Sequence, residues 1–100
     1  MNDLIILCGN LGKDPKVKYG EKKAVTYFNI AINKGYGENR RTMWFTIQCL
    51  GKLAENVGNN LLKGAKVLVR GNIEIGVNAE GTEYMFIRAK EVKFLDKKAS

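Results

Sequence analysis

The chain has 100 residues, enough for one domain with a modest hydrophobic core. Its 17 Lys and Arg outnumber its 10 Asp and Glu, which gives a formal net charge of +7. Such a surplus favours a polyanionic partner, because neutralising phosphates releases condensed counterions. The chain has no histidine and only two cysteines, Cys8 and Cys49, and its acidic residues are scattered singly. We therefore expect no metal site, no cofactor and no enzymatic activity.

Neither membrane insertion nor export is indicated. The apolar run Leu4 to Cys8 is too short to span a bilayer, and no basic segment followed by a long apolar stretch precedes it. Lys and Arg are spread over predicted strands and loops, whereas proteins that bind membrane surfaces gather them on an amphipathic helix. We expect a cytoplasmic protein without a membrane partner, with both thiols buried and reduced.

Two strands are predicted in the first third of the chain. Leu4 to Leu11 is almost continuously apolar, and turn-forming residues follow it as far as Pro15. From Ala24 to Asn33, polar and apolar residues alternate in the manner of a half-buried strand. The side predicted to face the core carries Thr26, Phe28, Ile30 and Ile32.

A basic loop and a third strand follow. Residues 34–41 are polar and contain glycine, so they predict a mobile hairpin loop outside the core. Met43 to Leu50 alternates again, and its core side carries Phe45, Ile47 and Cys49. The opposite side places Trp44 beside Thr46 and Gln48. A large aromatic residue among polar neighbours indicates contact with a ligand.

One helix and two more strands complete the prediction. Leu53, Val57 and Leu61 recur every four residues, which predicts a helix over 52–62 that Gly64 can terminate. Lys66 to Ile75 is the fourth predicted strand, and a loop over 76–82 leads to the fifth. This last strand, Tyr84 to Leu95, is expected to turn Met85, Ile87 and Ala89 inward and Tyr84, Phe86, Arg88 and Lys90 outward.

Five strands with one helix between the third and the fourth is the element order of an OB-fold, an all-β Greek-key barrel. We assign this fold to residues 1–96 and treat residues 97–100 as a short tail. The usual ligand surface of the fold is the face of its second and third strands, with the flanking loops. Trp44 is predicted to lie on that face.

The candidate binding residues combine aromatic rings with cations, as in proteins that stack nucleic-acid bases while neutralising phosphates. Tyr84 and Phe86 are expected either to stack on bases or to cover a subunit contact. Lys16, Lys18, Lys22 and Lys23 are expected to add a diffuse positive field only. The predicted polar and backbone contacts are Arg40, Arg41, Thr46, Gln48, Arg70 and Arg88.

Several segments, in their order and spacing, resemble the bacterial single-stranded DNA-binding protein family, including its phage and mitochondrial relatives. The resemblance runs from about Met1 to about Leu95. It is carried by Leu4–Pro15 (LIILCGNLGKDP), Phe28–Ala31 (FNIA), Trp44-Phe45, Leu50–Glu55 (LGKLAE) and Leu62-Lys63-Gly64 leading to Gly71.

The resemblance implies sequence-tolerant binding of single-stranded DNA in replication, repair and recombination. Trp44 matches a base-stacking tryptophan of that family, Tyr36 lies where another stacking aromatic is common, and Lys52 matches a lysine that contacts the DNA backbone. Two departures are expected to weaken binding or shorten the site. Leu50 stands where many relatives carry a stacking phenylalanine, and no tryptophan occurs near Val77.

The resemblance also bears on partners. It implies a homo-oligomer, with a tetramer favoured over a dimer. Family members generally continue into a flexible linker that ends in an acidic tip and recruits other proteins, whereas Lys97-Lys98-Ala99-Ser100 has no such tip. Partners recruited by such a tail are therefore not supported by this sequence, which is either a DNA-binding domain alone or a naturally short form. In a bacterial source the protein would be associated with the nucleoid, and in a phage it would act in the host cytoplasm.

Other functions remain open at this point. An RNA-binding OB module or a primosomal single-stranded DNA-binding dimer would have the same basic face with a different partner. A small metal-dependent nuclease would need clustered carboxylates, which the spacing of the acidic residues does not provide.

Overall fold

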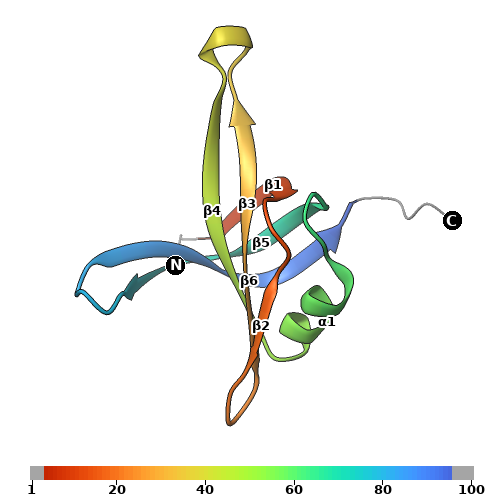
Figure 1. The fold of residues 1–100 in the computed structure, drawn as a ribbon, viewed down its shortest axis with the longest axis vertical. Helices are drawn as coiled ribbons and strands as arrows, with labels where there is room; N and C mark the ends of the chain where they lie inside the picture. Colours follow the sequence, from red (N-terminus) through yellow and green to blue (C-terminus); the bar gives the residue numbers. More distant parts are fainter. Residues whose placement is uncertain (1–3, 96–100) are drawn as a thin grey trace, which may run out of the picture.

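The computed structural model describes residues 4–95, and most of them belong to strands (Figure 1). One short α-helix and one turn of 3-10 helix interrupt the strands. The elements in chain order are β1 (Leu4–Leu11), β2 (Lys16–Tyr19), β3 (Ala24–Lys34), the 3-10 turn Gly37–Asn39, β4 (Arg41–Leu50), α1 (Lys52–Asn60), β5 (Lys66–Val77) and β6 (Glu83–Phe94).

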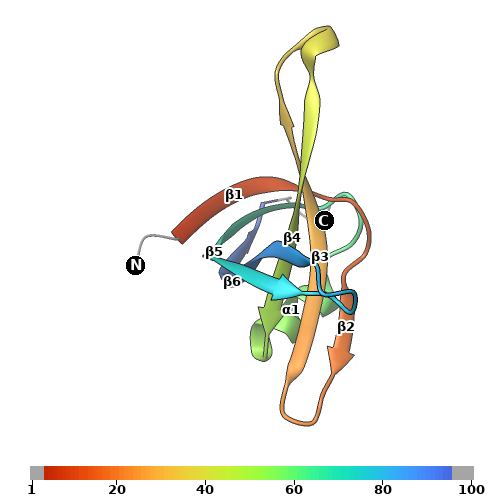
Figure 2. The ribbon, with the colours of Figure 1, turned by 90° about the vertical axis from the view of Figure 1, so that its left-hand side faces the viewer.

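The sheet closes into a ring because β1 pairs on both of its edges. Residues 4–10 pair antiparallel with β5, and the last two residues of the strand also pair with β3, at Asn10↔Ala31 and Leu11↔Ile30. The strand order is β1-β5-β6-β4-β3-β2, and β4 and β6 run parallel where they meet. Figure 2 shows β1 lying along β5 and reaching across to β3. A closed ring with one helix between β4 and β5 confirms the predicted all-β OB-fold.

The structure contains one strand that the sequence did not predict. β2 is four residues long and pairs with the first part of β3, with Lys16 opposite Tyr27. Val17 of this strand packs against Gly58 of the helix. One inward apolar residue between two lysines is too weak a pattern to reveal a strand.

The two long hairpins extend farther than predicted. β3 and β4 remain paired as far as Lys34 and Arg41, so the connection is shorter than the expected loop over 34–41. β5 likewise continues through Gly76, opposite Tyr84, to Val77. Both hairpins project from the barrel (Figure 1), where cross-strand pairing with the neighbouring strand sustains them without a core.

The barrel interior is filled by aliphatic side chains of the ring strands. Ile30, Ile47, Ile87, Val67 and Val69 are fully buried. Helix α1 covers one end of the barrel with Ala54 and Val57. On β3, the buried Thr26 donates a hydrogen bond from Oγ1 to the carbonyl oxygen of Ala54 at 2.7 Å, which ties the strand to the helix.

The two cysteines differ in environment, contrary to the expectation that both are buried. Cys49 is inside the core, and desolvation there raises the pKa of its thiol from 9.0 to about 12, so the thiol stays protonated at neutral pH. Cys8 is exposed because it shares the outward side of β1 with Leu4 and Ile6. The apolar run Leu4 to Cys8 is therefore not buried on both faces of β1.

Two residues of β6 also differ from the predicted alternation. Met85 was expected in the core but is 50% exposed, because the end of the β5–β6 hairpin lies beyond the barrel. Phe86 was expected outside but is only 8% exposed. Its ring centroid lies 5.9 Å from that of Tyr84, and the guanidinium carbon of Arg88 lies 5.9 Å from the same ring. Neighbours on its own strand thus cover Phe86.

Candidate nucleic-acid interface

Trp44 stands on the outer face of the β3–β4 pair. The period-two alternation of β4 sends Ile47 and Cys49 into the core and turns Trp44 outward, where it is 59% exposed. Its partner across the sheet is Ala31 of β3, whose small side chain leaves room for the indole. The structure therefore places a large aromatic surface on the predicted ligand face.

Gly12 supports the indole from the far side of β3. A Cβ atom at Gly12 would lie 2.6 Å from Cζ3 and 2.8 Å from Cη2 of Trp44. The backbone N–H of Gly12 donates to the carbonyl oxygen of Asn29 at 3.1 Å, which holds the glycine against the edge of β3 opposite β4. The indole must therefore extend across β3 with its six-membered ring on Gly12. Only a residue without a side chain permits this contact.

A hydrogen-bonded row crosses the same face. Nε of Arg88 donates to Oε1 of Gln48 at 3.1 Å, and Nε2 of Gln48 donates to the hydroxyl oxygen of Tyr27 at 2.9 Å. The three residues come from β6, β4 and β3, which are neighbours in the sheet. The structure thus brings together two of the predicted contacts, Gln48 and Arg88. Tyr27 is a member of the row that the sequence analysis did not select.

Thr46 lies between this row and Trp44. It is half-buried and faces Asn29 across the β3–β4 pair. Nearer the hairpin tip, the hydroxyl of Thr42 donates to Oδ1 of Asn33 at 2.8 Å. The outer face of this pair therefore combines one large ring with a run of small hydroxyl and amide groups, which can donate or accept hydrogen bonds with a bound chain.

The tip of the β3–β4 hairpin gathers three other predicted residues. Tyr36 is 91% exposed, and its carbonyl oxygen accepts a hydrogen bond from the backbone N–H of Asn39 at 2.9 Å. Arg40 and Arg41 follow directly and are exposed. An exposed ring and two guanidinium groups are therefore carried on one projecting arm (Figure 1).

The aromatics of β6 are not equally available. Tyr84 is 45% exposed, and its ring lies on Gly76, where a Cβ atom would be 2.6 Å from Cζ and 2.7 Å from the hydroxyl oxygen. Phe86, which lies beneath Tyr84 and Arg88, presents little surface to any ligand. Its burial is contrary to the expectation of an open stacking ring, whereas the exposure of Tyr84 agrees with it.

Of the other predicted cations, Arg70 and Lys52 lie apart from Trp44, whereas Arg88 belongs to the hydrogen-bonded row. Arg70 is opposite Ile6 of β1 and donates from Nε to Glu91 of β6 at 3.2 Å, so its closest neighbours belong to another part of the barrel. Arg88 lies 3.8 Å from Glu74 in addition to its bond with Gln48. Lys52 is exposed at the start of α1, beyond the end of β4 opposite the hairpin tip. The structure therefore does not bring all the predicted residues into one cluster.

Residues 4–95 contain no group of three His, Cys, Asp or Glu that could hold a metal ion. No helix within the same range is long and apolar enough to cross a membrane.

Replacing Gly12 with alanine tests the contact with the indole. The added Cβ must displace the ring, so we expect the emission of Trp44 to shift to longer wavelength and its quenching by acrylamide to increase. The free energy of unfolding should fall by about 1 kcal/mol, since an exposed ring can move aside. Trp44 is the single tryptophan, so the emission reports this site alone.

Gly20→Ala is the matched control, because a Cβ there would meet its nearest atom at an ordinary 3.6 Å. Unchanged emission and quenching in Gly12→Ala would show that the ring does not rest on Gly12.

Comparison with known proteins identifies the family. The model of the single-strand binding protein family matches residues 1–95. A single-stranded DNA-binding protein of Fusobacterium nucleatum is 35% identical, over 98% of this chain and 70% of its own. A protein of the same name from Caldanaerobacter subterraneus subsp. tengcongensis is 36% identical, over 99% and 71% of the two chains. The resemblance seen in the sequence is confirmed, and the chain belongs to the single-strand binding protein family.

Proposed function

We propose that this protein binds single-stranded DNA without sequence preference and protects it during replication, repair and recombination, acting in the cytoplasm. The observation that carries the proposal is the exposed indole of Trp44, held on Gly12 among polar groups of a chain with net charge +7. The names of the two relatives support the same ligand. Binding and shielding a strand requires no catalytic group.

Binding begins with electrostatic attraction. The exposed cations of the hairpin arm, Arg40 and Arg41, and Lys52 at the other end of β4 attract phosphates from either direction along the strand. Arg70 and Arg88 contribute less, because each faces a carboxylate at 3.2 Å and 3.8 Å respectively. Phosphate contacts of this kind carry no information about sequence.

Base stacking then fixes the strand. Trp44, Tyr36 and Tyr84 expose ring surface on which bases of any identity can stack, and each such platform contributes roughly 1–3 kcal/mol per base. Thr46 provides a hydroxyl beside Trp44, and both ends of the Gln48 amide are already hydrogen-bonded to Tyr27 and Arg88, so Gln48 is not free for the bidentate contact that reads a base edge. Stacking with few edge contacts accounts for sequence tolerance.

We further propose that the protein is a homotetramer. Leu4 and Ile6 on the outward side of β1 are 54% and 58% exposed, and Ile75 and Val77 on the β5–β6 arm are 69% and 62% exposed. Apolar surface on two separate elements is typical of chains that cover it by association, and a tetramer can bury both through two kinds of contact.

Sedimentation equilibrium tests the assembly. We expect a mass four times the 11.2 kDa of one chain, and a smaller mass for Ile6→Glu, because the carboxylate would be buried in the contact. A monomer at micromolar concentration would contradict the proposal of association. A dimer would show that the chain associates but would overturn the tetramer.

Trp44→Ala tests the stacking role. We expect the Kd for a fluorescein-labelled oligo(dT), followed by anisotropy, to rise roughly 5- to 150-fold, the equivalent of about 1–3 kcal/mol. The melting temperature should change little, since the ring is largely exposed. Arg41→Ala should instead reduce the slope of log K against log salt by about 0.7, the value for one phosphate contact in a single strand.

Tyr19→Ala is the control, because this exposed ring is on the side of β2 that carries Val17, away from Trp44. Duplex DNA and RNA of equal length complete the comparison. Unchanged affinity in Trp44→Ala would remove the ring from the site, and a preference for RNA would replace DNA as the ligand.

A further inference from the structure

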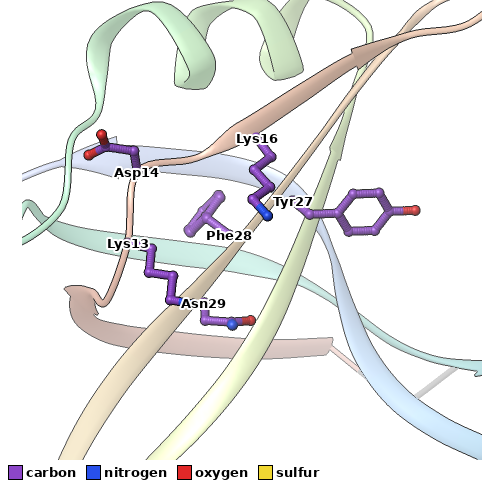
Figure 3. Close-up of a pocket in the computed structure, with 6 residues that line it drawn as sticks. All are labelled: Lys13, Asp14, Lys16, Tyr27, Phe28 and Asn29. Carbon is purple, nitrogen blue, oxygen red and sulfur yellow. The ribbon is translucent and has the colours of Figure 1, made fainter.

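A small pocket lies beside β3, next to the segment that joins β1 to β2 (Figure 3). Its volume is about 180 Å³, and none of the proposed stacking residues lines it. The residues that line it are Lys13, Asp14, Lys16, Tyr27, Phe28 and Asn29.

The pocket is adjacent to Gly12, the residue on which the indole of Trp44 lies. Lys13 directly follows Gly12, on which the indole lies, and Asn29 is the residue whose carbonyl oxygen binds the Gly12 N–H. Lys16 is paired with Tyr27 across the β2–β3 ladder, and directly paired residues project to the same side of a sheet. A chain stacked on Trp44 can therefore continue across β3 into the pocket without leaving this face.

The charge of the pocket is positive. Lys13 and Lys16 are both exposed, and both point toward β3 in Figure 3, whereas Asp14 points away from them. Oδ1 of Asp14 accepts a hydrogen bond from the backbone N–H of Lys63 at 2.7 Å, so this carboxylate is already bound elsewhere. The ion pairs of Arg70 with Glu91 and of Arg88 with Glu74 do not involve a lysine of the pocket.

The neutral groups around the two lysines suit an oxyanion. The side chain of Asn29 is exposed and carries an NH₂ donor. Tyr27 points away from the two lysines in Figure 3, and its hydroxyl oxygen accepts a hydrogen bond from Gln48 of β4. Phe28 is 4% exposed and forms an apolar floor. Two lysine ammonium groups and the amide of Asn29 thus border a space large enough for a phosphate.

We propose that this pocket binds a phosphodiester group of the same single strand that stacks on Trp44. Lys13 and Lys16 pair with its oxygens, so the strand runs from the β3–β4 arm over Trp44 and across β3 to β2. The proposal rests on the proposed function and adds a defined contact where the sequence analysis expected Lys16 to supply only a diffuse field. It also makes the occupied stretch of DNA longer than the Trp44 face alone.

The test compares two double variants that remove the same charge. Lys13→Gln/Lys16→Gln empties the pocket of cations, whereas Lys90→Gln/Lys93→Gln removes two exposed lysines of β6 outside the pocket. Binding of poly(dT) is followed by the fluorescence of Trp44 over a range of salt concentrations. We expect the slope of log K against log salt to fall by about 1.4 in the pocket variant, two contacts of about 0.7 each, and by much less in the control.

The maximal quenching of Trp44 should be the same in all forms, because stacking itself is intact. Lys13→Arg/Lys16→Arg should restore the slope, since guanidinium groups also pair with phosphate. Equal slopes in the pocket and control variants would overturn the subsite while leaving DNA binding in place. Failure of the unmodified protein to bind poly(dT) would overturn the proposed function and the subsite together.

Discussion

The double pairing of β1 is the constraint on which the binding face depends. Its last residues pair with β3 while residues 4–10 pair with β5, and this closes the ring. Closure places Gly12, one residue beyond the strand, against the edge of β3. The glycine then provides the surface on which the indole of Trp44 lies. Barrel closure and the orientation of the stacking ring are thus two results of one strand pairing.

The same pairing determines the charge around the indole. Lys13 directly follows Gly12, and β2, which begins at Lys16, then pairs with β3. Both lysines therefore lie on the face beside Trp44. On the opposite side, the row Arg88–Gln48–Tyr27 holds its side chains by hydrogen bonds across three strands. Positive charge on the β2 side and at the hairpin tip therefore comes from Lys13, Lys16, Arg40 and Arg41, whereas the arginines of β5 and β6 are paired with acids.

Local sequence pattern predicts the parts of this arrangement that local geometry determines. Alternation along residues 43–50 predicts that Trp44 faces outward and that Ile47 and Cys49 face the core, and both are confirmed. The order of five strands and one helix predicts the fold. The exposure of Tyr36 and Tyr84 also agrees with the sequence, because turns and outward strand positions have recognisable compositions.

Contacts between distant segments are not contained in such patterns. Nothing local distinguishes Gly12 from an ordinary turn glycine, since its importance comes from a ring 32 positions later in the chain. The ion pair of Arg70 with Glu91 and the burial of Phe86 depend on register and on where the barrel ends. Tyr27, like Trp44, is an aromatic residue on the outward side of a predicted strand, so the sequence could have indicated it as a site residue. That Tyr27 pairs with Gln48 follows only from the register of β3 against β4.

The most direct test of the account is the fluorescence of Trp44 in the unmodified protein, titrated with poly(dT) at low and high salt, with duplex DNA as the control. The account predicts strong quenching by the single strand, weaker binding at high salt and no quenching by the duplex. Unchanged emission at saturating poly(dT) would contradict it, because a strand could then bind without touching the ring on which the proposed site is built.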